Sequence, residues 1–340
     1  MIYRSKAPLR IGLAGGGTDV SPYCDLYGGA VLNATISLYA YASIELLDTD
    51  DIIIEAIDRK EIEVHKRSAQ LPINGKLDLA KGVYNRIVRD RGDVPSGFKL
   101  TTFVDAPAGS GLGTSSTLMV AIIGAFVEWL NLPLGEYDIA HLSYQIERNE
   151  LQMAGGKQDQ YAATFGGVNF MEFYKEDKVI VNPLRIKQKY LHELENNLLL
   201  YFTATSRLSS TIIEEQQKNV SNKNEKSIEA MHQLKEQAQM MKEALLTGKI
   251  DEIGKILDFG SRYKKQMAQG ISNPKMDELY EAALKAGATG GKISGAGGGG
   301  FMMFYCPGNS HYKVHETLMH FGGNFHRYQF TNTGLISWTI

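Results

Sequence analysis

Alternating and periodic apolar positions divide the chain into a strand-rich first half and a helix-rich second half. Alternating or short apolar runs predict strands, of which two, 52–57 and 61–64, form a hairpin. The expected strands of the first half are 6–14, 35–46, 52–57, 61–64, 99–104, 167–173, 178–184 and 197–203. Helical spacing predicts helices over 79–91 and 137–151, and the long apolar run 118–130 predicts a buried helix. Strands with helices inserted among them are typical of an α+β domain.

The composition changes near residue 206, where the chain becomes rich in Glu, Gln and Lys. Apolar residues of the segment 209–247 fall on one helical face, which predicts an amphipathic helix pair with a solvated outer side. These residues are Met231, Leu234, Met241 and Leu245. Further helices are expected over 251–266 and 276–287, followed by a strand over 301–305.

The length of 340 residues exceeds the usual size of a single hydrophobic core, so two domains are expected. The boundary falls between 175 and 205, and we place it after residue 190. The predicted domains are therefore 1–190 and 191–340.

Glycine is concentrated in three clusters, 15–17, 109–113 and 295–300, and each adjoins hydroxyl or charged side chains. The second cluster lies between a predicted strand and the buried helix. Its glycines allow close backbone approach to an anion, and the hydroxyls of 114–116 stand where a helix N-terminus offers free N–H groups. The loop has no Lys or Arg, so it is not a Walker A sequence. A tight turn with a Ser/Thr cap explains this stretch, taken alone, equally well.

The third cluster formally matches the dinucleotide-binding fingerprint at Gly295, Gly297 and Gly300. A strand follows it where that fingerprint requires a helix, so the match is rejected. Close backbone approach to a partner or to a ligand explains this cluster better.

Three carboxylates lie beside glycines or hydroxyls: Asp19, Glu147 and Asp159. Glu147 precedes Asp159 by twelve residues, with a Gly-Gly pair between them, so the two could converge on one pocket. Mg²⁺ prefers oxygen ligands, which suits Glu147 with Ser115. A pair of unrelated surface acids is the alternative. The histidines have no metal-ligand spacing.

Charge and cysteine content narrow the classes of function. The net charge is −2 without any block of like charge, so neither nucleic acid nor a membrane surface is an expected partner. Cys24 and Cys306 are far apart, which favours free thiols in a reducing compartment. No secretory signal is visible, and the longest uncharged apolar run is too short to span a bilayer. We therefore expect a cytoplasmic protein.

The three glycine motifs, 7–19, 107–117 and 292–300, resemble in sequence and order those of the GHMP small-molecule kinases. The resemblance implies an N-terminal domain like ribosomal protein S5 domain 2 and a ferredoxin-like C-terminal domain. It also implies that ATP is a co-substrate, held by the second and third motifs. The implied ATP-binding residues are Pro107, Gly109, Ser110, Gly111, Leu112, Gly113, Thr114, Ser115, Ser116, Ser294, Gly295, Ala296 and Gly297.

The same resemblance implies roles for four side chains. Asp159 would accept or orient the substrate hydroxyl, and Arg10 would lie beside the transferring phosphate. Ser115 and Glu147 would hold Mg²⁺. Whether Asp159 is a true base is open, because a loose transition state requires little proton transfer.

The first motif indicates the substrate class. Galactokinases carry Glu-His where this chain has Gly16-Gly17, and the loss of two large side chains opens the sugar pocket beside Thr18 and Asp19. The segments 9–20 and 28–33 resemble the branch of the family that phosphorylates heptose 7-phosphates. This implies transfer to the anomeric O1, giving a 1,7-bisphosphate on the way to nucleotide-activated heptose for surface glycans. A fucokinase or other anomeric sugar kinase is one alternative. A non-catalytic sugar and ATP sensor is another, against which the intact catalytic set argues.

A substrate that already carries a phosphate needs a cationic contact. Lys157 and Arg207 are the predicted members, and Lys6 is a further candidate. Lys157 stands two residues from Asp159, although each of the three could be an ordinary surface charge. The oligomeric state is left open.

Overall fold

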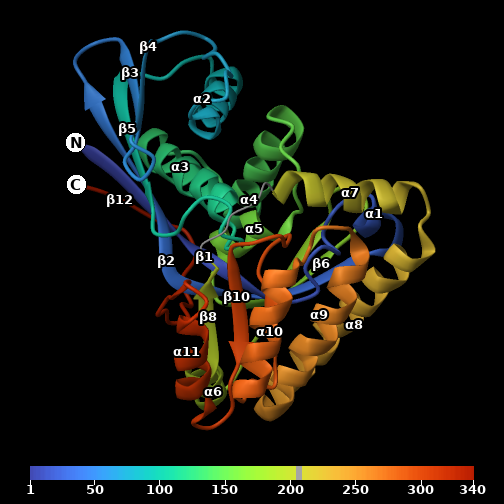
Figure 1. Cartoon of the computed structure of the whole chain (residues 1–340). Coiled ribbons are helices and arrows are strands. Elements are labelled where there is room, and N and C mark those ends of the chain that lie inside the picture. Colours follow the sequence, from blue (N-terminus) through green and yellow to red (C-terminus); the bar gives the residue numbers. More distant parts are fainter. Residues whose placement is uncertain (204–208) are drawn as a thin grey trace.

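A mixed eight-stranded sheet forms the framework of the first half of the chain (Figure 1). The computed structural model describes residues 1–203 and 209–340. The strands of this sheet are β1 (Ile2–Ala14), β2 (Gly29–Leu47), β3 (Asp51–Ala56), β4 (Glu61–Lys66), β5 (Gly97–Val104), β6 (Val168–Phe173), β7 (Val179–Pro183) and β12 (Ile336–Thr339). The main path is β12-β1-β2-β5-β3-β4, with β6 and β7 added beside the first part of β2. Only β3 and β5 pair in parallel among these strands. The predicted strands and the hairpin are confirmed.

Helices are inserted between the strands of this half of the chain, and some of them carry candidate site residues. They are α1 (Tyr23–Tyr27), α2 (Asp78–Arg91), α3 (Thr114–Leu130), α4 (Glu136–Tyr144), the π-helical segment η1 (Gln145–Glu150) and α5 (Gln158–Phe165). The predicted apolar helix is α3, which packs against β1 and β2 and is buried along most of its length. The helix expected over 137–151 is α-helical only as far as Tyr144. The short helices α1 and α5 were not predicted.

The second half is built around an antiparallel sheet in the order β11-β8-β10-β9. Its strands are β8 (Leu198–Phe202), β9 (Gly290–Ile293), β10 (Phe301–Tyr305) and β11 (Asn324–Phe325). The helices are α6 (Gln188–Asn197), α7 (Ser209–Ser221), α8 (Glu225–Thr247), α9 (Ile253–Met267), α10 (Pro274–Ala286) and α11 (Ser310–Met319), with a 3₁₀ turn, Ile250–Glu252, before α9. The predicted amphipathic pair is α7 and α8, and the four apolar residues of its inner face are buried. Within the described ranges, no helix combines the length and apolar character needed to cross a membrane.

The end of the chain returns to the first sheet. Strand β12 pairs antiparallel with β1, and the Ile2 N–H donates to the carbonyl of Ile340 at 2.9 Å, so the two termini lie together (Figure 1). The boundary after residue 190 assigned this strand to the second domain, and that part of the assignment is wrong. An unpaired β1 edge would expose a row of backbone donors and acceptors, which β12 covers. The division elsewhere stays a prediction.

Strand β9 and helix α9 approach each other unusually closely through two glycines. A Cβ atom on Gly290 would lie 1.8 Å from the carbonyl oxygen of Gly254, and one on Gly254 would lie 1.9 Å from Thr289 Oγ1. Backbone atoms cannot move aside as a flexible side chain can. The position of α9 relative to β9 is therefore fixed by the absence of these two side chains.

We expect Gly290→Ala to lower the free energy of unfolding by about 1–3 kcal/mol, because overpacking would push α9 away from β9. Guanidinium denaturation checks this. Gly135→Ala is the matched control, since its Cβ would meet nothing closer than Asp138 Oδ2 at 3.5 Å. Equal stability of the two variants would contradict the steric argument.

Candidate active site

A cleft of about 460 Å³ brings together side chains from both halves of the chain. Its lining includes parts of all three glycine clusters and residues of η1, α5, α7, α9 and β9. The ionisable residues of the lining are Arg10, Asp19, Glu147, Arg148, Asp159, Glu214, Lys264 and Lys292. The catalytic and metal-binding candidates predicted from sequence are thus in one place.

The second and third glycine clusters touch backbone to backbone. A Cβ on Gly111 would lie 2.6 Å from the Ser294 carbonyl oxygen, and one on Gly295 would lie 2.7 Å from Gly111 Cα. The Phe301 N–H donates to the Ser110 carbonyl at 2.9 Å, and Ser294 Oγ donates to the Gly111 carbonyl at 2.7 Å. The third cluster therefore approaches the backbone of the second cluster closely, and its approach to a ligand stays a prediction.

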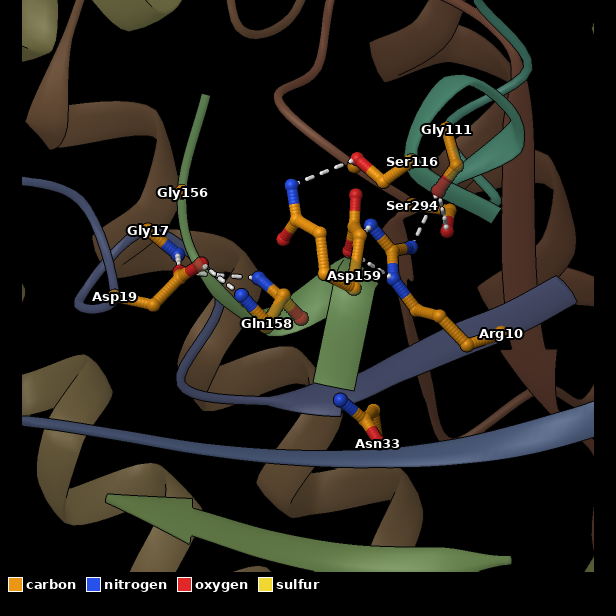
Figure 2. A network of polar contacts seen from close by, with 12 residues as sticks. Arg10, Gly17, Asp19, Asn33, Gly111, Ser116, Gly156, Gln158, Asp159 and Ser294 are labelled. Atoms are coloured by element: carbon orange, nitrogen blue, oxygen red, sulfur yellow. Dashed lines mark hydrogen bonds and ion pairs between the residues drawn. The ribbon is translucent and has the colours of Figure 1, made fainter. Parts of the chain in front are cut away.

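Arg10 joins this contact to Asp159 (Figure 2). Its Nε and Nη2 lie 2.7 and 2.6 Å from Asp159 Oδ1, and its Nη1 donates to the Gly111 carbonyl at 2.6 Å. Asp159 Oδ2 accepts no hydrogen bond from the part of the chain that the structure describes. The Asp159 side chain is 20% exposed, so this free oxygen can reach a bound molecule.

Glu147 lies at the centre of a second polar cluster. Its Oε1 accepts a hydrogen bond from Ser115 Oγ at 2.8 Å, and its Oε2 accepts from Ser116 Oγ at 2.6 Å and Gln160 Nε2 at 2.7 Å. Arg148 Nη1 lies 3.2 Å from Oε1. The buried Glu147 is carried by the π-helical segment η1, and such segments are frequent at functional sites.

This donor set fits a hard divalent cation. The Ser115 hydroxyl donates its hydrogen bond to Glu147, so its oxygen lone pairs remain available to a metal ion. The described residues contain no group of three or more His, Cys, Asp or Glu side chains that could hold a metal alone. Mg²⁺ typically uses one or two protein carboxylates together with substrate phosphates and water. Ser115 and Glu147 therefore fit a magnesium site completed by a ligand.

Asp19 is buried in the cleft lining and accepts hydrogen bonds from three N–H donors. It accepts from the Gly17 N–H at 3.1 Å, the Gln158 N–H at 3.1 Å and Gln158 Nε2 at 3.0 Å (Figure 2). A Cβ on Gly156 would lie 1.9 Å from Asp19 Oδ2, so this position requires glycine. Asp19 thereby fixes the beginning of α5, where Asp159 follows Gln158.

The other residues of the first motif differ in their access to the cleft. Gly16 and Gly17 line it, whereas Thr18 is buried outside the lining and bonds to the backbone of Ala30. The space beside Gly17 is filled by Met267, whose Cε lies 2.5 Å from the position of a Cβ. The expected opening of the pocket therefore applies to Gly16 and not to Gly17.

Some of the predicted nucleotide-binding residues line the cleft, and the others lie outside its lining. Ser110 and Leu112 are buried, and Pro107 is exposed outside the cleft. Ser294 supports the lining through Gly111, and Gly297 packs on Ile271. The lining itself contains Gly109, Gly111, Gly113, Thr114, Ser115, Ser116, Gly295 and Ala296.

Two of the cations predicted to contact a distal phosphate, Lys157 and Lys6, are not in the lining of this cleft. Lys157 is buried and paired with Asp177 at 2.7 Å and Asp25 at 3.5 Å, beside an adjoining hollow of about 350 Å³. Burial lowers the pKa of Lys157, but the Asp177 carboxylate and other neighbours more than offset this, so its pKa is raised. Lys6 lies over the Tyr39 ring at 4.7 Å, away from the cleft. Arg207 lies outside the described residues.

Sequence reasoning assigned no role to Lys264 and Lys292, which line the cleft and are 6% and 5% exposed. Burial lowers the pKa of Lys264 to about 8, with Asp19 raising it and Arg10 lowering it further. Burial, Lys264 and Arg10 together lower the pKa of Lys292 well below its usual value. A signal for Lys264 was present, since it falls on the apolar side of α9 with Leu257 and Met267.

Two family models match the chain. The model of the GHMP kinases N terminal domain matches residues 78–167, and that of the GHMP kinases C terminal matches residues 241–315. The chain is 48% identical over 337 residues to D-glycero-alpha-D-manno-heptose 7-phosphate kinase of Campylobacter jejuni, covering 99% of both chains. It is 29% identical over 309 residues to the bifunctional fucokinase/GDP-fucose pyrophosphorylase of Arabidopsis thaliana, covering 88% of this chain and 29% of that protein.

Solved structures of kinases of this family have a similar fold. A D-glycero-D-manno-heptose 1-phosphate kinase from Bacteroides thetaiotaomicron matches with a TM-score of 0.85 and 46% identity over 99% of both chains. Lactococcus lactis galactokinase in complex with galactose matches with a TM-score of 0.78 at 17% identity, covering 98% of this chain and 95% of that one, which shows the fold alone.

The buried lysines predict pH-dependent binding of polyphosphates. A bound polyanion favours the charged ammonium, so Lys264, with a pKa of about 8, and Lys292 must gain protons as the anion binds. We expect the affinity for magnesium AMPPNP, a triphosphate analogue, to fall as the pH rises above about 8, by up to ~10-fold per unit for each proton taken up. Titration calorimetry between pH 7.5 and 9.5, in buffers of different ionisation enthalpy, measures both the affinity and the number of protons taken up. Lys264→Arg stays charged and should give a shallower decline. An affinity that does not change with pH in the native protein would contradict this.

Proposed function

Because the chain belongs to the GHMP kinase family, we propose that it transfers the terminal phosphoryl group of ATP to the anomeric O1 of D-glycero-D-manno-heptose 7-phosphate. Membership makes it a phosphotransferase that acts on a hydroxyl group, and the family and fold expected from the three motifs are confirmed. The similarity to heptose-phosphate kinases at 46–48% identity extends over nearly the whole chain and supports a heptose-phosphate kinase. It favours neither a fucokinase nor a sensor.

The free Oδ2 of Asp159 is the observation that carries the proposed chemistry. Arg10 binds only Oδ1, so it keeps the carboxylate oriented and leaves Oδ2 to accept a hydrogen bond from the sugar hydroxyl. Arg10 stabilises the carboxylate and the charge that develops on the transferring group. Asp159 takes the proton late, since a loose transition state requires little proton transfer before the bond to phosphorus breaks.

Ser115 and Glu147 would hold Mg²⁺, which when bound neutralises charge on the nucleotide phosphates. Gln160 and Ser116 keep Glu147 in place, and the N-terminus of α3 at Thr114 directs free N–H groups toward phosphate oxygens. Asp19 and Gly16 would face the sugar. The product, a 1,7-bisphosphate, would serve the synthesis of nucleotide-activated heptose for surface glycans. A cytoplasmic location belongs to the same proposal and suits the free, buried Cys24 and Cys306.

An assay of ATP turnover in the presence of magnesium, with a panel of sugars and sugar phosphates as acceptors, tests the identity of the substrate. We expect turnover of heptose 7-phosphate, with a new phosphorus signal coupled to the anomeric carbon in ³¹P–¹³C NMR. Free heptose, L-fucose and galactose are the comparison substrates. Efficient use of an unphosphorylated sugar with none of heptose 7-phosphate would overturn the assignment, as would a new phosphate at another carbon.

We expect Asp159→Asn to lower kcat by ~10²–10⁴-fold, because the amide cannot accept the proton. The affinity for ADP should change little, since Asp159 faces the acceptor. Steady-state kinetics and ADP titration measure the two effects. Glu172→Gln is the control, because Glu172 lies on β6 outside the cleft and contacts Tyr174 and Asn182. A fully active Asp159→Asn enzyme would show that Asp159 has another role.

A further inference from the structure

We propose that Lys292 and Lys264 form an anion-binding pair on the C-terminal wall of the cleft, which contacts the phosphoryl group during its transfer. The inference rests on the proposed kinase function and names two further catalytic residues for it. Both come from the second half of the chain, whereas Arg10 and Asp159 come from the first. The transferring group would thus meet cations from both halves.

Lys292 is a buried amine without a polar partner among the described residues. It lies in β9 opposite Met303 of β10, is 5% exposed and lines the cleft. No described residue forms a hydrogen bond or ion pair with its ammonium group. A buried charge is costly unless it is paired, so an unpaired ammonium beside a cleft points to an anionic ligand that completes the site.

Lys264 is held in place by one hydrogen bond, and its other N–H donors have no hydrogen-bond partner among the described residues. Its Nζ donates to the Gly295 carbonyl at 2.7 Å, and it lies 3.9 Å from the position of a Cβ on Gly16. An ammonium group has three N–H donors, so two remain for a ligand. Since Gly295 packs directly on Gly111, Lys264 is held where the phosphate loop meets the first glycine cluster.

The surroundings identify the anion as the phosphoryl group in transfer. Arg10 acts electrostatically on both lysines and lines the same cleft, and it contacts both Asp159 and Gly111. The distal hollow near Lys157 lies on the other side of Asp19 and already has its own ion pairs. A phosphate at the lysine pair would therefore lie between the nucleotide loop and the acceptor hydroxyl.

The step itself leaves both lysines protonated. The sugar O1 forms a bond to the terminal phosphorus of ATP as the bond from that phosphorus to the bridging oxygen of ADP breaks. The O1 proton passes to Asp159 Oδ2, and ADP leaves with the bridging oxygen. The ammonium groups donate to the non-bridging oxygens, whose charge the low-dielectric cleft would otherwise leave uncompensated.

Lys292→Met and Lys264→Met test the pair in the full-length protein. We expect Lys292→Met to lower kcat by ~10²-fold or more, as for loss of one preorganised charge-stabilising donor. Lys292→Arg should recover part of that loss because it keeps the charge. Lys285→Met is the control, since Lys285 is exposed at the end of α10, outside the cleft, and has no hydrogen bond or ion pair with any described residue.

Two measurements separate this role from a structural one. Removal of an unpaired buried charge should raise the thermal midpoint of Lys292→Met, whereas loss of a structural contact would lower it. Magnesium AMPPNP should bind this variant about tenfold more weakly than it binds the native protein, with ADP binding unchanged, because only the triphosphate reaches the pair. Weakened binding of both nucleotides, or of neither, would overturn the proposal.

The acceptor's own phosphate is the competing ligand. If the pair held it, Lys292→Met would raise KM for heptose 7-phosphate and leave AMPPNP binding intact, which would also overturn the proposal. The AMPPNP titration requires no acceptor, so it tests the pair even if heptose 7-phosphate is the wrong substrate. Native protein that fails to bind AMPPNP would instead count against the kinase function as a whole.

Discussion

The carbonyl oxygen of Gly111 accepts hydrogen bonds from Arg10 and from Ser294, at the point where the two glycine loops pack without side chains. A Cβ at Gly111 or Gly295 would force the loops apart, and with them the strand of Arg10 and the strand that precedes Ser294. The geometry of the cleft therefore depends on a contact that only glycine permits. The same few backbone atoms therefore form the proposed phosphate site and the contact between the two halves of the chain.

Charge is distributed unevenly across the cleft. The acidic residues are held by donors of the protein itself, Asp19 by three N–H groups and Glu147 by two hydroxyls and an amide. The cations on the opposite wall have fewer partners, and burial depresses the pKa of Lys264 and Lys292. Without a bound anion, these poorly paired buried lysines are electrostatically unfavourable. A bound polyphosphate relieves this unfavourable energy, which favours strong binding. The absence of a lysine from the 109–113 loop is thus compensated by residues distant in the sequence.

Much of this arrangement could be predicted from the sequence, because it depends on local patterns. Apolar periodicity located the strands of the first sheet and the helix α3, and the ordered glycine motifs brought Arg10, Glu147 and Asp159 together. The failures have a common cause in tertiary contacts. The eight-residue helix α5 has no long apolar stripe of its own, and β12 is a strand only because β1 offers it an edge.

The same cause explains why the surroundings of the cations could not be predicted. Lys157 looked available because it is near Asp159 in sequence, but the fold places Asp25 and Asp177 against it. Neither the apolar side of α9 that carries Lys264 nor the motif that carries Lys292 shows in sequence that the two lie in one cleft, which follows from the packing of α9 against β9. Ion pairing between distant residues has no period or motif that could reveal it.

In the proposed reaction, the acceptor side and the nucleotide side of the cleft are held by different parts of the backbone. Asp19 ties the first glycine cluster to the N-terminus of α5, so the acceptor region and Asp159 form one unit. The Gly111–Ser294 contact fixes the nucleotide side. Arg10 contacts both, through Asp159 and through Gly111, and its side chain is 5% exposed. Because a guanidinium is planar and its donors are rigidly arranged, Arg10 sets the distance between acceptor and nucleotide as well as supplying charge. A lysine at this position could supply the charge but could not hold both partners in one plane.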